Sequence, residues 1–228
     1  MRDRILEELD TEGLRAAFLE YTRKAYRMIP PIDRPRILDA GCGTGQPTVE
    51  LALLSDGDIV AIDPDENALD TLRLRIEKEG LSDRVRTVCC SIFETGFTAA
   101  TFDIIWEEGV FHLLDTQRVL TESVRLVPEG GFLVMFETNE WFERTHEHFS
   151  EHGLDLFQKL PLPPGCWWTR YYAPLEERVA VLREKYRETE DHEVLSRFER
   201  EAEAVKADVS KSDCSFILMR RRRGRRAR

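Results

Sequence analysis

The sequence lacks the marks of a secreted, zinc-binding or membrane protein. Its five cysteines are scattered, odd in number and without a C-x-x-C pair, which argues against a disulfide framework and a zinc site. No apolar run approaches the length of a bilayer-spanning helix, and residues 1–30 alternate charged and apolar residues where a signal peptide needs an uninterrupted apolar segment. We therefore expect a cytoplasmic protein with no metal ion and no membrane segment.

Basic charge is scarce outside one short segment. Residues 220–228 carry seven of the 33 lysines and arginines, so the preceding residues have 26 basic against 43 acidic side chains. An acidic body repels nucleic acid, which argues against a nucleic-acid partner. Residues 221–228 are expected to form a solvated, disordered basic tail. The alternative is that this tail docks on the acidic body or on an anionic partner.

Apolar and amphipathic segments alternate regularly over residues 36–137. A chain of 228 residues can bury one sizeable core, and continuous apolar strands separated by amphipathic helices predict a parallel sheet covered on both faces. The expected strands are 36–40, 58–63, 84–90, 102–108 and 132–137. The expected helices between them are 47–54, 65–79 and 115–127.

The flanking segments are more helical. Residues 1–30 have helical periodicity, which the prolines at 30, 31 and 35 end. A helix near 140–152 and a strand at 153–163 follow the core, and two charged helical segments then precede a last strand at 213–220. We expect residues 1–220 to be a single domain with a helical insertion before this last strand.

The stretch "RILDAGCGTGQP" (36–47) is suited to holding a ligand close to the backbone. Gly41, Gly43 and Gly45 lack a Cβ and tolerate positive φ. A dinucleotide fingerprint would read G-x-G-x-x-G/A, whereas here the third glycine comes one residue early. The carboxylate of Asp39 disfavours a diphosphate and favours a ligand with an ammonium group. Asp63, at the end of the second strand, is placed to accept hydrogen bonds from ribose hydroxyls.

The segment "DAGCGTG" resembles motif I, D/E-x-G-x-G-x-G, of the class I S-adenosylmethionine-dependent methyltransferases. The similarity covers residues 36–137 and extends more loosely to 220, with "PEGG" as the family's turn and "SFILMR" as its last strand. It implies an α/β, Rossmann-like, doubly wound seven-stranded sheet, mostly parallel with an antiparallel last strand, with helices on both faces and an N-terminal helix. It also implies S-adenosylmethionine as cofactor and S-adenosylhomocysteine as product. The cofactor-binding residues expected from it are Asp39, Gly41, Cys42, Gly43, Gly45, Gln46, Asp63, Pro64, Ser91, Ile92 and Glu107.

Two of these residues, Ser91 and Cys42, need separate comment. The family often has an acid after the third strand for the adenine amino group, and Ser91 stands there. Its hydroxyl or the amide of Ile92 can serve adenine, with Glu94 as the alternative acid if the register slips. Cys42 is expected to be a small buried residue and not a nucleophile.

The segment after the fourth strand reads "WEEGVFHLL" and lacks the N/D-P-P-Y/F motif of enzymes that methylate nucleobases or amides. It is similar to a segment of small-molecule methyltransferases. Glu107 or Glu108 is expected to face the cofactor. His112 is the candidate catalytic residue, as a general base; the alternative is a hydrogen-bonded structural histidine. The expected substrate residues are Tyr21, Glu108, Trp167, Trp168, Tyr171 and Tyr172, although these rings could equally pack the inserted helices.

The sequence thus predicts a methyltransferase that acts on an unidentified small molecule by in-line displacement, as a monomer or homodimer. Residues 36–137 would be the cofactor-binding core, and residues 1–30 and 140–206 would cover the substrate. Two alternatives remain. One is a protein of this fold that binds a cofactor or partner without transfer, and the other is a methyltransferase for a macromolecule.

Overall fold

The computed structural model describes residues 2–187 and 192–224, which form two compact units. The larger unit comprises residues 19–160 and 215–228, and the smaller unit comprises residues 1–18 and 161–214. The predicted core, 36–137, lies within the larger unit. The N-terminal helical segment divides between the two, because the boundary falls after Phe18.

The larger unit is built on a seven-stranded sheet with the order β3-β2-β1-β4-β5-β7-β6. Strands β1 to β5 are joined by parallel pairings. The last strand is antiparallel to both neighbours, because Arg221 at its end exchanges backbone hydrogen bonds with Gly130 and Gly131 before β5, and Arg222 N donates to Gly153 O before β6. The strands are β1 (Arg36–Ala40), β2 (Asp58–Asp63), β3 (Val85–Cys89), β4 (Ile104–Glu108), β5 (Phe132–Thr138), β6 (Leu154–Pro161) and β7 (Cys214–Arg221).

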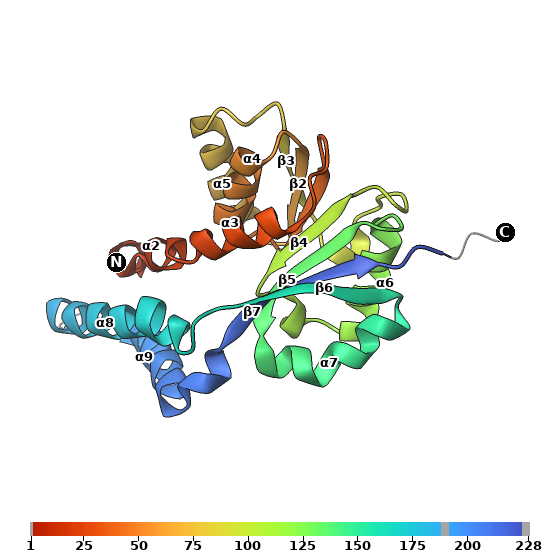
Figure 1. Ribbon diagram of the computed structural model, residues 1–228. Coiled ribbons are helices and arrows are strands. Elements are labelled where there is room, and N and C mark those ends of the chain that lie inside the picture. Colours follow the sequence, from red (N-terminus) through yellow and green to blue (C-terminus); the bar gives the residue numbers. More distant parts are fainter. Residues whose placement is uncertain (1, 188–191, 225–228) are drawn as a thin grey trace. The chain divides into compact units, whose positions relative to one another are not determined.

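Helices cover both faces of this sheet (Figure 1). In the larger unit they are α3 (Leu19–Met28), α4 (Gln46–Leu54), α5 (Glu66–Lys78), α6 (Thr116–Leu126) and α7 (Asn139–Glu151). Adjacent residues of β1 point to opposite faces, yet Ile37 and Leu38 are both fully buried. Leu38 belongs to the cluster that packs under α6 and α7, which includes Val119 and Trp141. The predicted fold is confirmed.

Short polar side chains start three of these helices. Asp65 accepts from Asn67 N at the start of α5, Asp115 from Arg118 N at α6, and Thr138 from Trp141 N at α7. Thr138 is the last residue of β5, and Asp65 and Asp115 lie in the segments that follow β2 and β4. These turns therefore gather at one edge of the sheet, which is where ligands bind in open α/β sheets.

The basic segment begins later than predicted. Strand β7 continues to Arg221, whose guanidinium donates to the carbonyls of Val124 and Val127. Arg222 Nε donates to Asp155 Oδ1 at 2.8 Å. The prediction of a tail from residue 221 was therefore wrong for these two positions, because their partners lie on elements far away in the sequence. Residues 225–228 lie outside the described part of the chain.

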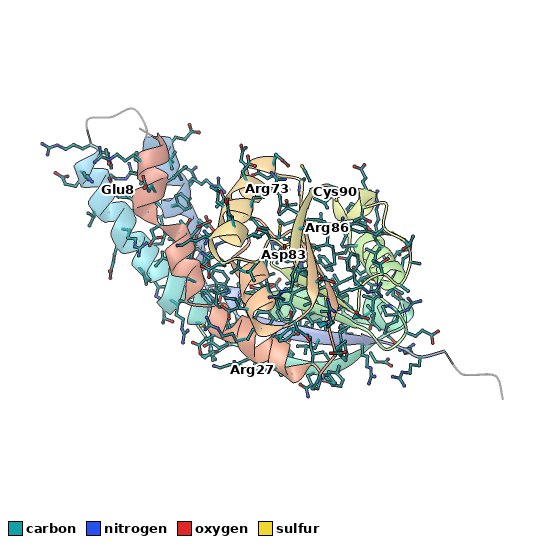
Figure 2. The ribbon with its side chains drawn as sticks, turned by 90° about the horizontal axis from the view of Figure 1, so that it is seen from above. Glu8, Arg27, Arg73, Asp83, Arg86 and Cys90 are labelled. Carbon is teal, nitrogen blue, oxygen red and sulfur yellow. The ribbon has the colours of Figure 1, made fainter. Side chains whose placement is uncertain are left out.

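The smaller unit is helical. It contains α1 (Arg2–Leu9), α2 (Thr11–Ala16), α8 (Ala173–Lys185) and α9 (His192–Ala207), with a π-helical turn at Trp168–Tyr172. Polar contacts hold its N-terminal segment to α8. Glu8, labelled in Figure 2, accepts from Lys185 Nζ at 2.5 Å and from Tyr186 Oη at 2.8 Å. Arg178 donates to the carbonyls of Leu9 and Asp10.

Within residues 2–187 and 192–224, no helix is long and apolar enough to cross a membrane. The same residues contain no group of three or more His, Cys, Asp or Glu side chains placed to hold a metal ion.

Candidate active site

The glycine loop runs from the end of β1 to the start of α4, and all three of its glycines have positive φ. A Cβ on Gly41 would lie 2.5 Å from Val110, and one on Gly45 would lie 2.1 Å from Leu72. A Cβ on Gly43 would meet no atom within 4 Å. The outer two glycines are therefore required by packing, while Gly43 presents bare backbone to open space, as a loop that approaches a ligand must.

Asp63 fixes the conformation of this loop. It ends β2, and its Oδ2 accepts from Gly43 N at 2.9 Å while its Oδ1 accepts from Asp65 N at 2.8 Å. Its carboxylate is only partly buried. Each carboxylate oxygen can accept more than one hydrogen bond, so Asp63 has acceptor capacity left for hydroxyl donors.

Asp39 lies beneath the loop. It is 2% exposed, and its Oδ2 accepts from Thr48 Oγ1 on α4 at 2.5 Å. Burial raises the pKa of this carboxyl to about 7, with a smaller contribution from the nearby charge of Asp63 and an opposing one from Thr48. Asp39 thus links β1 to α4 and places a titratable group under the glycine loop.

The other predicted cofactor residues lie around this loop or after β3. Cys42 is buried with its Sγ 3.7 Å from Gly43 O, and burial raises the pKa of its thiol. Gln46 begins α4, and Pro64 follows Asp63. Ser91 caps the short helical turn Ile92–Glu94 by accepting from Phe93 N at 3.3 Å, and the side chain of Ile92 is buried.

Glu107 and Glu108, at the end of β4, point to opposite faces of the sheet. Glu108 Oε1 accepts from Trp106 Nε1 and from Thr22 Oγ1 on α3, each at 2.9 Å. Burial raises the pKa of Glu108 to about 7, against the effect of these two donors. Tyr21, beside Thr22 on α3, is buried, with Lys24 Nζ 4.7 Å from its ring centroid.

Glu107 is fully buried on the other face. Its Oε2 accepts from Val110 N at 3.0 Å and from Phe111 N at 3.4 Å. Its Oε1 has no hydrogen-bond partner among the described residues. Burial, reinforced by the charge of Glu137, raises the pKa of Glu107 well above its usual range.

Glu137, near the end of β5, is the residue that sequence reasoning missed. Its side chain is 1% exposed, and it accepts from His112 twice: Oε1 from the backbone N at 3.0 Å, and Oε2 pairs with Nδ1 at 2.9 Å. Glu137 raises the pKa of His112. The available signal was an acid at the carboxyl end of the fifth strand, where parallel strands bring their last residues together.

The four aromatic residues predicted for the substrate belong to the smaller unit. Trp167 stacks on Phe18 with ring centroids 4.3 Å apart, and it also contacts Tyr171 and Tyr172. Tyr172 Oη donates to Glu201 at 3.2 Å, and Lys206 Nζ lies 5.4 Å from the Trp168 ring centroid. The structure thus brings the rings of Trp167, Tyr171 and Tyr172 into mutual contact, while the Trp168 ring contacts Lys206. The glycine loop, Asp63, Ser91, Glu108 and His112 belong to the other unit.

Sequence comparison now identifies this architecture. A profile described as "Methyltransferase domain" matches residues 38–135, the segment from β1 through β5 that carries the glycine loop, Asp63 and His112. Residues 38–135 are thus similar to a methyltransferase domain. The resemblance to class I S-adenosylmethionine-dependent methyltransferases is therefore confirmed.

Similar proteins support the same assignment. The chain is 28% identical over 127 residues to the 27-O-demethylrifamycin SV methyltransferase of Amycolatopsis mediterranei (strain S699). This alignment covers 55% of this chain and 47% of that protein. The chain thus spans less than half the length of this curated relative.

Two solved structures share the fold. The [4+2]-cyclase SpnF aligns with a TM-score of 0.74 at 17% identity, over 89% of this chain and 81% of that one. A putative sarcosine dimethylglycine methyltransferase from Galdieria sulphuraria aligns with a TM-score of 0.70 at 16% identity, over 93% and 85%. At these identities the similarity concerns the fold alone.

Proposed function

We propose that this methyltransferase domain binds S-adenosylmethionine and transfers its methyl group to a small molecule. The observation that carries the proposal is the glycine loop over Asp63, in which Gly43 offers bare backbone to open space and Asp63 retains acceptor capacity. S-adenosylmethionine supplies a methyl carbon already activated by a sulfonium sulfur. The protein's task is then to orient the two reactants, exclude water and accept a proton where the acceptor carries one.

Different residues of the larger unit would contact different parts of the cofactor. Asp63 would bind the ribose hydroxyls, Gly43 and its neighbours the methionine portion, and Ser91 or Ile92 the adenine. Asp39 supports the loop from below and supplies negative charge under a cationic ligand. Residues 36–137 would form the cofactor-binding core, and residues 1–30 and 140–206 would cover the acceptor. The contact residues would be Tyr21, Trp167, Trp168, Tyr171 and Tyr172.

Cofactor binding is tested by calorimetry with S-adenosylhomocysteine. Asp63→Ala should weaken binding about 5- to 150-fold, which corresponds to about 1–3 kcal/mol for hydrogen bonds left unpaired. Asp58→Ala is the matched control, since Asp58 is an exposed aspartate at the other end of the same strand. Equal affinities of the two variants would contradict the ribose assignment.

Methyl transfer is tested with methyl-labelled S-adenosylmethionine and a panel of small metabolites. The proposal predicts labelled product and S-adenosylhomocysteine in equal amounts for at least one acceptor. Cofactor binding without any turnover would instead favour the alternative of a non-transferring protein. The structural similarity to a [4+2]-cyclase shows that this fold also occurs in a protein named for another reaction.

A further inference from the structure

The turn that carries His112 is held by two buried carboxyl groups from neighbouring strands. Three consecutive backbone amides donate to them: Val110 N and Phe111 N to Glu107 on β4, and His112 N to Glu137 on β5. Glu107 pairs in register with Met135, so Glu107 and Glu137 are diagonal neighbours on one face of the sheet. The position of the His112 backbone is therefore fixed from below by two strands.

The two carboxyl groups differ in their environment. Glu137 has hydrogen bonds to both of its oxygens, one from a backbone amide and one from the imidazole. Glu107 is fully buried beside it, with one oxygen that no described residue contacts by a hydrogen bond. Burial, reinforced by the charge of Glu137, raises the pKa of Glu107 well above its usual range, so Glu107 is neutral near pH 7.

The contact between Glu137 and the ring fixes the tautomer of His112. A carboxylate only accepts hydrogen bonds, so Nδ1 must carry the proton that it shares with Glu137 Oε2. The unprotonated nitrogen of the neutral ring is then Nε2. The His112 side chain is 41% exposed, so the ring is accessible on the side away from the buried carboxylate.

We propose that Glu137 is the positioning residue that makes His112 Nε2 a general base, and that the methyl acceptor is a hydroxyl group. The inference rests on the proposed function. In this step His112 Nε2 takes the hydroxyl proton and the oxygen forms a bond to the methyl carbon. The carbon–sulfur bond breaks, and its electron pair returns to sulfur to give the neutral thioether S-adenosylhomocysteine. The imidazolium then releases its proton to solvent.

The need for a base separates hydroxyls from other acceptors. A neutral amine attacks with its own lone pair, and a methylated alkene gives a carbocation so acidic that an ordinary base suffices. An alcohol or phenol is a poor nucleophile until its proton is removed. A histidine whose tautomer and basicity are set by a buried carboxylate is therefore suited to a hydroxyl.

The charged groups around the Val110–His112 turn have other partners, and the imidazole of His112 pairs with Glu137. From β4, Glu107 accepts hydrogen bonds from the backbone amides of Val110 and Phe111 in the turn. From α6, Asp115 accepts from Arg118 N at 2.7 Å, while the Arg118 guanidinium lies 4.1 Å from the Phe93 ring centroid. The pH dependence of the step is thus expected to follow His112 and to respond to Glu137.

The tautomer is tested by two-dimensional ¹H–¹⁵N NMR of histidine-labelled full-length protein, with His112→Asn to assign the signal. The expected wild-type spectrum shows a neutral Nδ1–H ring at high pH. In Glu137→Gln the pKa of His112 should fall and the Nε2–H tautomer should appear. Glu107→Gln is the matched control, because it exchanges one neutral group for another on the adjacent strand, and it should retain the tautomer. The signals of His146, His148 and His152 report whether each variant is folded.

An Nε2–H tautomer in the folded wild type, or a His112 signal that Glu137→Gln leaves unchanged, would overturn the role of Glu137. This readout needs no turnover, so it is independent of whether the proposed function holds.

The acceptor class is tested with labelled S-adenosylmethionine and paired compounds that carry a hydroxyl or an amino group on the same scaffold. We expect transfer to hydroxyls, a rate that rises with pH through the His112 pKa, and a loss of about 10²- to 10⁴-fold in kcat for His112→Ala. Glu137→Gln should lower kcat and move the rising limb to lower pH. Transfer to amines that His112→Ala leaves intact would overturn the hydroxyl assignment. Absence of transfer to any compound would remove the proposed function and the acceptor assignment together, and the NMR result would still stand.

Discussion

Gly43 and Gly45 look equivalent in the sequence, but their surroundings in the glycine loop differ. Gly43 and Gly45 both have positive φ, but only Gly45 faces a neighbour, Leu72. An alanine in the left-handed region costs about 1–3 kcal/mol in either place. At position 45 overpacking against Leu72 adds about 1–3 kcal/mol more.

We therefore predict that Gly45→Ala lowers the free energy of unfolding clearly more than Gly43→Ala does. Denaturant unfolding of the two variants checks this. Gly43→Ala should instead act on the ligand side, with weaker binding of S-adenosylhomocysteine in calorimetry, because the new methyl group occupies the open space above the loop. Equal losses of stability would contradict the packing argument.

The two carboxyls with a pKa near 7, Asp39 and Glu108, predict how stability depends on pH. Their folded-state pKa values lie above those of the unfolded chain, at about 4, so the folded state binds protons more tightly. Their contribution is fully present below pH 4 and is lost as the pH rises through about 7. The ligand-free protein should thus lose stability between pH 5 and pH 8.

For Asp39 this loss amounts to about 2–4 kcal/mol, at about 1.4 kcal/mol for each unit of pKa difference. Asp39→Asn removes the titration but retains a polar side chain, so its free energy of unfolding should change less over the same range. Urea unfolding of both proteins at pH 5, 6, 7 and 8 measures the difference. Parallel pH profiles would show that Asp39 does not titrate in this window.

Sequence reasoning found the residues that a local pattern marks and missed those that only the fold brings together. Asp39, the glycines and Asp63 stand out because each ends a strand or interrupts the chain with a flexible residue. Glu137 lies 25 residues after His112 and becomes its partner only because β4 and β5 are adjacent in the sheet. Which of Glu107 and Glu108 lies on which face also required the register of these strands.

At the scale of elements, α3 is tied to the sheet by polar contacts at the candidate site. The fully buried hydroxyl of Thr22 donates to Glu108, and Arg23 forms two hydrogen bonds with Glu50 on α4 at 2.6 and 2.9 Å. Tyr26 packs against Trp106, with ring centroids 6.3 Å apart. The position of α3 thus depends on the same carboxyl group, Glu108, that lies beside the site.

Thr22→Val tests this dependence, because valine matches the shape of threonine but cannot donate. We expect a loss of about 1–3 kcal/mol in the free energy of unfolding, since Glu108 Oε1 loses one of two donors in a largely buried place. Thr22→Ser retains the hydroxyl and should lose less. If valine and serine destabilise the protein equally, the cost comes from packing and not from the hydrogen bond.

The strands and helices of the core lie within about two residues of their predicted ends, because most are bounded by a proline, glycine or capping residue. The N-terminal segment differs. Instead of one helix it forms α1, α2 and α3. Asp10 adopts φ 46° and accepts from Gly13 N, which ends α1 and starts α2. A left-handed aspartate leaves no mark in hydrophobic periodicity, so the periodicity did not show that Asp10 makes this break.

At the scale of the whole molecule, the C-terminal strand completes the sheet. The contacts of Arg221 and Arg222 show that the basic segment is partly structural, although the net charge of the protein is −10. Truncation after Gly224 should leave the unfolding temperature and methyl transfer unchanged. Truncation after Arg220 removes the backbone pairing of Arg221 with Gly130 and Gly131 and should destabilise the protein.

Thermal unfolding of the two truncated proteins distinguishes these roles. A loss of activity without loss of stability after removal of residues 225–228 alone would instead indicate that these residues contact the acceptor. That result would favour a macromolecular acceptor over the small molecule that we propose.

A crystal structure with S-adenosylhomocysteine tests whether the glycine loop and Asp63 bind S-adenosylmethionine. We expect the ribose hydroxyls within hydrogen-bond distance of the Asp63 carboxylate, with the methionine portion against the backbone at Gly43. A ligand bound elsewhere, or a ribose that does not contact Asp63, would contradict this expectation.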